Sequence, residues 1–477
     1  MFVNSMQQRY RSALAVMKRG GCLLADALSG REQDYTRGRI GRAVLLLAIP
    51  MVLEMGMESV FAIVDIFFVA RLGADAVASV GLTEAVLTLL YAIAIGLSMG
   101  ATAMVARRIG EKNPAAANVV AAQTVWVGGV LAIVIGVGGV IYASDILRFM
   151  GGNASVVSDG SSYTAIMLGG SVTILFIFLF NAIFRGAGDA VVAMRVLWLA
   201  NGINIVLDPC LIFGLGPFPE LGVAGAATAT NIGRGAGVLF QLYLLANGHS
   251  RVRLNLTRCH LNVQVLLRLL RISLGGVMQF LIATSSYLFL MRIVARYGTT
   301  AVAGFTIGIR IFAFTFLPAW GLGNAAATLV GQNLGAGNPN RAESSVWRAA
   351  KYNAVFLVIT AIVLIFCAES LVGFFTVEAA VIAYAADCLR YISYGYGFYA
   401  VGMVVTQAFN GAGDTATPTK INLACFWVFQ IPFAYFLAET LALGPRGVFV
   451  SIAAADSLLA IVAVMAFRRG DWKLKVV

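Results

Sequence analysis

The sequence predicts an all-α polytopic membrane protein, with twelve transmembrane helices in two six-helix bundles related by a pseudo-twofold axis along the membrane normal. Three observations support this prediction. The 477-residue chain is 60% hydrophobic and only 12% charged, about half the charged fraction of a soluble domain. Apolar segments long enough to cross a bilayer recur along the chain. The sequence also partly repeats itself in two halves.

Each predicted span is an apolar segment of roughly 20 residues or more, the length that a helix needs to cross the hydrocarbon core. Few charged residues interrupt these segments, and the loops between them are short. The spans are 43–70, 78–106, 118–143, 161–184, 190–214, 222–247, 267–295, 301–330, 348–373, 380–409, 417–440 and 446–467.

The net charge of +12 follows from topology. With a cytoplasmic N-terminus, most Lys and Arg residues fall in the N-terminal tail (1–42), in the loops after even-numbered spans and in the C-terminal tail (469–477). This is the positive-inside distribution. It predicts a multi-pass protein of the cell (inner or plasma) membrane with both termini in the cytoplasm. The bilayer accounts for the charge, and we expect no nucleic-acid partner.

The two halves match at a shift of 225 residues. The stretch "VARLGADAVA" (69–78) aligns with "VARYGTTAVA" (294–303), and "RGAGD" (185–189) aligns with "NGAGD" (410–414). Each half holds six spans, so both cross the membrane in the same direction, as in parallel-repeat transporters. We therefore expect an N-lobe at 43–247 and a C-lobe at 267–468, joined by a cytoplasmic linker at 248–266.

Acidic residues inside the spans are the main functional signal, because a charge at the bilayer centre is costly. In span 1 the three acids share one helix face, and in span 5 two amides and an acid share another. At the 225-residue shift Asp65 falls on Leu290 and Asp208 on Phe433, or on Ile431 when the two prolines that follow are aligned, so the second half has lost both acids. The site is therefore expected in the N-lobe, and its polar residues are Glu54, Glu58, Asp65, Asn201, Asn204 and Asp208.

Two chemistries fit such a site. A carboxylate in a medium of low dielectric takes up a proton from one side and releases it to the other. Alternatively, two carboxylates surround a sodium ion together with amide and hydroxyl oxygens, which span 6 supplies from Thr228, Thr230 and Asn231. The structural alternative is pairing with Arg185, Arg195 or Arg234. Glu54 and Glu58 can also extend toward the headgroups.

At these residues the chain resembles the multidrug and toxic compound extrusion (MATE) family, over about 43–468. The resemblance implies a two-lobe antiporter, not an enzyme, that exports organic cations or other amphipathic compounds in exchange for Na⁺ or H⁺. It implies no cofactor, and we expect a monomer. The stretches that carry it are "VDIFFVARLGADAVASVG" (64–81), "FRGAGDA" (184–190), "NIVLDPCLIFGLGPFPELGVAGAATAT" (204–230) and "LGNAAATLVGQNLGAGNP" (322–339).

The family's ion-coupling residues match Asp65, Asn204, Asp208 and Thr230, with Thr228 as the alternative threonine, and these four are the candidate Na⁺ ligands. Glu54, Glu58 and Asn201 are further ion-coupling candidates. Another branch of the family has acids in spans 7 and 10. Here span 7 has Gln279 in place of an acid, so the resemblance favours the branch with its cation site in the N-lobe.

Span 10 carries a cluster of tyrosines whose faces attract organic cations. With Gln279, they are the candidate lining of a substrate cavity: Tyr391, Tyr394 and Tyr399. Arg292 and Arg310 lie inside spans and either extend outward or meet an anionic substrate.

Two other functions remain. A flippase for a lipid-linked precursor shares the two-lobe plan, but its cavity is expected to be more cationic. The duplicated "GAGD" (186–189 and 411–414) fits the G-x-G-D of intramembrane aspartyl proteases. It also fits a tight turn whose aspartate caps the next helix.

Overall fold

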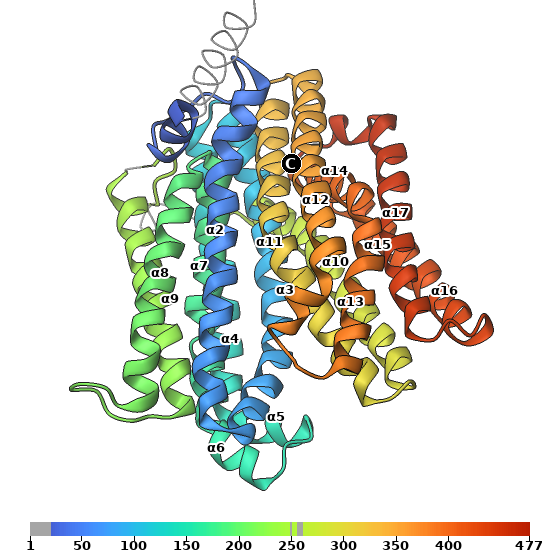
Figure 1. Cartoon of the computed structure of the whole chain (residues 1–477). Coiled ribbons are helices and arrows are strands. Elements are labelled where there is room, and N and C mark those ends of the chain that lie inside the picture. Colours follow the sequence, from blue (N-terminus) through green and yellow to red (C-terminus); the bar gives the residue numbers. More distant parts are fainter. Residues whose placement is uncertain (1–20, 249, 255–260) are drawn as a thin grey trace, which may run out of the picture.

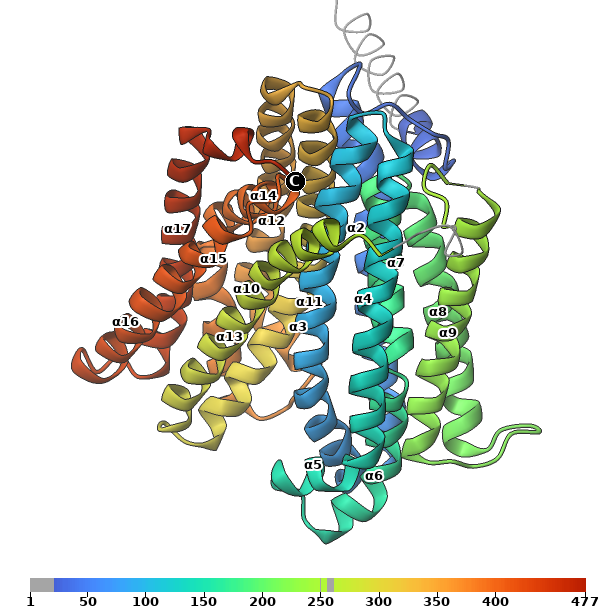
Figure 2. The same ribbon diagram turned by 180° about the vertical axis from the view of Figure 1, so that it is seen from behind.

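The computed structural model describes residues 21–248, 250–254 and 261–477, and the regular structure in these ranges is helical throughout (Figure 1). Two groups of long helices lie side by side, and each group comes from one half of the chain. The described residues of both terminal segments lie at the same end of the molecule (Figures 1 and 2), which we call the terminal end. The twelve-span, two-lobe fold is confirmed.

The first lobe contains all of the acids singled out in the sequence. Its helices follow one another up and down with short connections. They are α2 (Ile40–Val69), α3 (Ala74–Gly110), α4 (Pro114–Ile141), the short α5 (Ala143–Phe149), α6 (Ala154–Gly169), α7 (Ser171–Ala187), α8 (Ala190–Phe213) and α9 (Val223–Asn247).

The second lobe repeats this order. Span 11 of the chain, which belongs to this lobe, alternates α-helix with π-helical turns at Leu423–Gln430 and Phe436–Thr440. The helices are α10 (Val263–Ala295), α11 (Thr299–Gly335), α12 (Pro339–Gly373), α13 (Ala379–Tyr394), α14 (Tyr396–Gly411), α15 (Ala416–Asn422), α16 (Ile431–Tyr435) and α17 (Pro445–Arg469).

Spans 4 and 10 are each built from two helices. In the described chain, nine segments are long and apolar enough to cross a membrane alone, and α6 with α7 forms a tenth across a 40° bend. The bend lies at Gly170, where Asn231 of α9 packs so closely that a side chain would collide with its amide. Asn231 donates to the Ile166 carbonyl (2.8 Å) and accepts from Thr173 Oγ1 (3.0 Å). It therefore satisfies polar groups at the break.

The lobes pack tightly at the terminal end. Gly110 of α3 lies against the backbone of Gln332 in α11, and Gly335 of α11 lies against the Arg107 carbonyl of α3. Gln332 Nε2 also donates to the Gly186 carbonyl of α7 (3.0 Å). A side chain at either glycine would separate the helices, so these glycines permit the close contact between lobes.

Both terminal segments cross this contact. Tyr35 donates to the Gly188 carbonyl of the N-lobe (3.3 Å), while Arg341 of the C-lobe donates to the carbonyls of Tyr35, Arg37 and Gly38 (2.7–3.2 Å). At the other terminus, Arg108 of α3 donates to the Val477 carbonyl (2.9 Å). Residues 35–38 and 475–477 thus bridge the two lobes, an arrangement that the sequence did not indicate.

Candidate functional site

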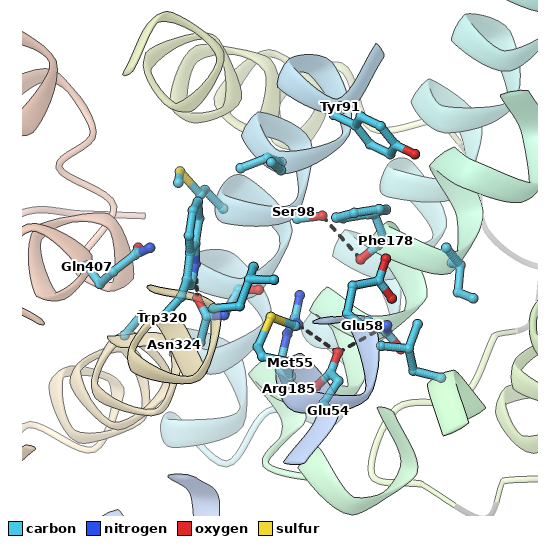
Figure 3. Close-up of a pocket in the computed structure, with 18 of the residues that line it drawn as sticks. Glu54, Met55, Glu58, Tyr91, Ser98, Phe178, Arg185, Trp320, Asn324 and Gln407 are labelled. Carbon is cyan, nitrogen blue, oxygen red and sulfur yellow. Dashed lines mark hydrogen bonds and ion pairs between the residues drawn. The ribbon is translucent and has the colours of Figure 1, made fainter. Parts of the chain in front are cut away.

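A cavity of about 450 Å³ lies between the lobes (Figure 3). On the N-lobe side it is lined by charged and polar side chains of α2, α3, α7 and α9. On the C-lobe side it is lined mainly by α11, with aromatic residues Phe316 and Trp320, and by the amides of Asn324, Gln407 and Asn410. The cavity therefore has one charged wall and one aromatic and amide wall.

The charged wall is built around a buried ion pair. Glu54 of α2 is 1% exposed, and its Oε1 accepts from Arg185 Nη1 of α7 (3.0 Å) and from Asn181 Nδ2 (3.3 Å). Gln241 Nε2 of α9 donates to Asn181 Oδ1 (2.6 Å). Glu54 thus does not extend toward the headgroups. Its carboxylate pairs with Arg185, so the structural alternative of an acid–arginine pair holds for this acid.

Glu58 lies one turn further along α2 and also lines the cavity. It is half-buried, and its Oε2 accepts from Asn201 Nδ2 of α8 (3.1 Å). Glu58 has no salt bridge within 4.0 Å among the described residues, in contrast to Glu54. The cavity therefore has a carboxylate that can meet a positively charged group.

A second cluster is buried inside the N-lobe, and its members do not line the central cavity. Asn204 Nδ2 of α8 donates to Thr230 Oγ1 of α9 (3.0 Å) and to Asp208 Oδ1 (3.4 Å). Asp208 is 0% exposed. Asp65 of α2 is close enough for its charge to act on Asp208. Helices α8 and α9 thus join three residues of the predicted ion site through hydrogen bonds, and Asp65 of α2 is near enough to interact with them electrostatically.

Glycine makes this cluster geometrically possible. A Cβ at Gly233 of α9 would lie against the Ala200 carbonyl and the Asn204 backbone of α8, so only glycine lets these helices approach closely. Asp208 Oδ2 and Asn204 Oδ1 are buried and have no hydrogen-bond partner among the described residues. Two unpaired oxygens at one place form a site that can take a proton or a cation. Thr228 instead donates to the Ala224 carbonyl (2.8 Å), outside the cluster.

The predicted substrate residues lie elsewhere. Tyr391, Tyr394, Tyr399 and Gln279 do not line the central cavity. Tyr394 is 64% exposed, and Tyr399 packs behind Phe316, with ring centroids 5.9 Å apart.

Gln279 is buried and exchanges hydrogen bonds with the cavity residue Asn410 (3.0 and 3.2 Å), so it supports the wall from behind. Arg292 and Arg310 are exposed side chains outside the cavity.

Several residues escaped the sequence reasoning. Glu84 of α3 lies near Arg234 and Asp65, and Asp456 of α17 is a buried C-lobe acid (7% exposed). Both stand inside predicted spans, so a complete search for acids would have found them. Asn181 lies one turn before Arg185 on α7, a spacing that places both on one face, but their partner Glu54 is far away in sequence.

The two GAGD segments are turns at the terminal end. Gly188 and Gly413 have φ of 92° and 82°, which favours glycine. Asp189 does not cap α8 with its side chain, contrary to expectation. It accepts from Ser250 Oγ of the linker (2.5 Å), and burial raises the pKa of this carboxyl. Asp414 likewise accepts from Thr417 Oγ1 (2.8 Å). Each aspartate has a local structural partner.

Comparison with known proteins identifies the fold. The probable multidrug resistance protein NorM of Thermotoga maritima is 29% identical over 92% of this chain and 94% of its own. An FAD transporter of Shewanella oneidensis is 27% identical, covering 83% and 87% of the two chains. The multidrug export protein MepA of Staphylococcus aureus is 24% identical, covering 90% and 94%.

Solved structures agree. An outward-facing multidrug resistance MATE transporter of the MOP superfamily superposes with a TM-score of 0.87 at 28% identity, covering 92% of this chain and 98% of that one. These relatives are transporters, which removes the protease alternative. The family model described as MatE matches this chain twice, at residues 50–210 and 277–436. The chain therefore belongs to the MatE family of membrane transporters.

Proposed function

We propose that the protein is a secondary antiporter that exports cationic or other amphipathic small molecules in exchange for Na⁺ or H⁺. Ion coupling occurs at Asp65, Asn204, Asp208 and Thr230. The observation that carries the proposal is two buried oxygens, one on Asn204 and one on Asp208, that have no hydrogen-bond partner among the described residues. A membrane helix retains such a costly group for function more often than for stability.

The central cavity suits substrates that combine aromatic area with a positive charge. Phe316 and Trp320 offer flat apolar faces to the cavity, and Glu58 lines it from the other lobe. Trp320 and Glu58 are labelled in Figure 3. An aromatic face and a carboxylate both attract an organic cation. Multidrug resistance and multidrug export proteins among the relatives support this substrate class.

The distribution of contacts supports an outward-facing conformation. The core cluster that joins α2 to the C-lobe involves only its first part, from Ala43 to Met51. At the end of the molecule opposite the terminal end, each core cluster stays within one lobe. One cluster lies around Val69 and Leu87 of the N-lobe, and another lies around Leu290 and Phe305 of the C-lobe. With the termini in the cytoplasm, the lobes are closed toward the inside. Rocking about the cavity then gives alternating access.

The flippase alternative is less well supported. A site for a pyrophosphate needs an excess of positive charge. Here the cavity has Glu54 and Glu58 against Arg185 and Arg234, and Arg185 is already paired with Glu54. The balance of charge thus favours a cationic or zwitterionic guest over a doubly charged anion.

The test is dye efflux from proteoliposomes of wild type and Asp208→Asn, driven in turn by a Na⁺ gradient and by a pH gradient. We expect wild type to respond to one gradient and Asp208→Asn to fall to the level of protein-free liposomes, with normal expression. Asp145→Asn is the matched control, because its side chain is 65% exposed on the surface. Efflux that ignores both gradients, or that survives in Asp208→Asn, would reject the proposal.

A further inference from the structure

A basic pocket of about 860 Å³ lies at the terminal end, between the first turns of α2 and the first turns of α12. Four arginines line it, two from each side: Arg39, Arg42, Arg341 and Arg348. Among the described residues, no Asp or Glu lines it. Another polar pocket at this end has Glu32 and Asp34 beside its basic residues. The α2–α12 pocket therefore differs in having basic side chains without acids.

Most of this positive charge is not neutralised by an acid. Arg39 and Arg348 are exposed, and neither has a salt bridge within 4.0 Å in the described part of the chain. Arg42 is paired, with its Nη2 2.7 Å from Asp26 Oδ2. Arg341 donates from Nη1 and Nη2 to backbone carbonyls of residues 35–38, and its buried Nε has no hydrogen-bond partner among the described residues. Three of the four guanidinium groups thus lack an acidic partner.

The start of α2 adds further donors to the same pocket. Arg39 is the N-cap of this helix, no side chain caps it, and its first turn has no acidic residue. The free N–H groups and the helix dipole favour an anion at such a position. The Tyr352 hydroxyl of α12 stands at this turn, 2.9 Å from where a Cβ on Gly41 would be. Guanidinium, backbone N–H and hydroxyl groups therefore meet in one pocket.

The pocket lies at the boundary of the membrane. The predicted spans 43–70 and 348–373 begin beside it. Half-buried Leu23 and Leu45 line it together with the arginines. A basic pocket between membrane helices suits a lipid headgroup, because the arginines can hold the phosphate while the leucines contact the apolar part of the same molecule. A soluble anion would gain nothing from the leucines.

We propose that this pocket binds the phosphate of an acidic phospholipid from the membrane leaflet at the terminal end. Arg39 and the N-terminus of α2 hold the phosphate from one side, and Arg341 and Arg348 of the C-lobe hold it from the other. The lipid therefore bridges the two halves of the chain, next to the contacts that residues 35–38 make with Arg341. Lipid binding here does not depend on which ion or substrate is transported.

The experiment measures binding of phosphatidylglycerol to purified protein by native mass spectrometry, with phosphatidylcholine as the uncharged comparison. The variants are Arg39→Gln, Arg348→Gln and the two combined; both side chains are exposed and unpaired, so folding should not change. The control is Arg268→Gln/Arg271→Gln, which removes two exposed arginines of α10 outside the pocket. The melting temperature of each protein is measured with phosphatidylglycerol, phosphatidylcholine or inorganic phosphate.

We expect wild type to prefer phosphatidylglycerol to phosphatidylcholine. One basic residue near an anionic membrane surface contributes about fivefold to binding. Each single variant should therefore bind phosphatidylglycerol about fivefold more weakly, and the combined variant at least about tenfold more weakly. The control should bind like wild type. Phosphatidylglycerol should raise the melting temperature of wild type and of the control, but not that of the combined variant.

Four results would count against the lipid site. The combined variant could keep the wild-type preference for phosphatidylglycerol, or the control could lose as much binding, which would mean that any surface charge suffices. Inorganic phosphate alone could raise the melting temperature as much as phosphatidylglycerol, which would make the occupant a soluble anion. Weakening in only one of the two single variants would overturn the bridging of α2 and the C-lobe.

Discussion

Replacing Glu54 with glutamine tests whether the charged cavity wall depends on one buried ion pair. The substitution keeps the size and one acceptor oxygen but removes the negative charge beside Arg185. The Arg185 side chain is only 10% exposed, so water does not compensate for the loss. Removing one partner of a buried pair costs about 3–5 kcal/mol. Because the amide oxygen can still accept from Asn181, we expect about 3 kcal/mol of lost stability, near the lower limit.

A double-mutant cycle separates the pair from its environment. In Glu54→Gln/Arg185→Gln both charges are gone, and amide groups can still bond Asn181. The double variant leaves no uncompensated buried charge, which is what makes loss of one partner costly, so it should be more stable than Glu54→Gln. The measurement is the free energy of unfolding of purified protein in mixed micelles. Asp145→Asn, at an exposed pair, should cost under about 1 kcal/mol.

Efflux provides the functional half of this test. Glu54 lies in the cavity wall and not in the Asp208 cluster, so Glu54→Gln should reduce transport less than Asp208→Asn. Equal and complete inactivation of a folded Glu54→Gln protein would move Glu54 into the coupling site. If Glu54→Gln costs no more stability than Asp145→Asn, the reasoning from burial and pairing is refuted.

Two further predictions concern the contact between lobes and the tyrosines of span 10. Arg341→Ala removes three hydrogen bonds to residues 35–38, each worth about 1 kcal/mol net, so the two lobes should separate more often at the terminal end. Distances between spin labels at Lys112 and Asn340 should then show a larger long-distance population. An unchanged distance distribution would contradict a bridging role. Tyr394→Ala should leave efflux within about twofold of wild type, because this side chain is 64% exposed and outside the cavity, and singly exposed apolar positions rarely contribute. A substrate-specific loss of efflux in Tyr394→Ala would restore the tyrosines as binding residues.

The sequence predicts positions along a helix far better than partners across helices. The face shared by Glu54, Glu58 and Asp65 follows from helical geometry alone, and it brings α2 acids toward α8 as expected. That Glu54 pairs with Arg185 while Glu58 bonds Asn201 depends on how α2 packs against α7 and α8. No spacing along the chain encodes that choice.

The same limit explains the tyrosines. A cluster of aromatic residues in span 10 satisfies the composition of a binding cavity, but composition does not fix which way each side chain points. Tyr394 is 64% exposed, and Tyr399 packs behind Phe316. The aromatic wall comes from α11 instead, through Phe316 and Trp320. Phe312 and Phe314 precede them in the same stretch, so the density of aromatic residues along the chain does not tell which span lines the cavity.

Helix α2 links the proposed ion site to the contact between lobes. Its first part, to Met51, is buried in a core shared with the C-lobe, and Gly321 of α11 lies against the Met51 backbone. Its later part carries Glu54, Glu58 and Asp65 and bonds only N-lobe side chains. Pro50 stands inside the helix at the junction, where it removes one backbone hydrogen bond and permits bending. Under the proposed coupling at Asp65, a change of charge acts on the acid-bearing part of α2, and Pro50 is where the helix can bend between that part and the core shared with the C-lobe.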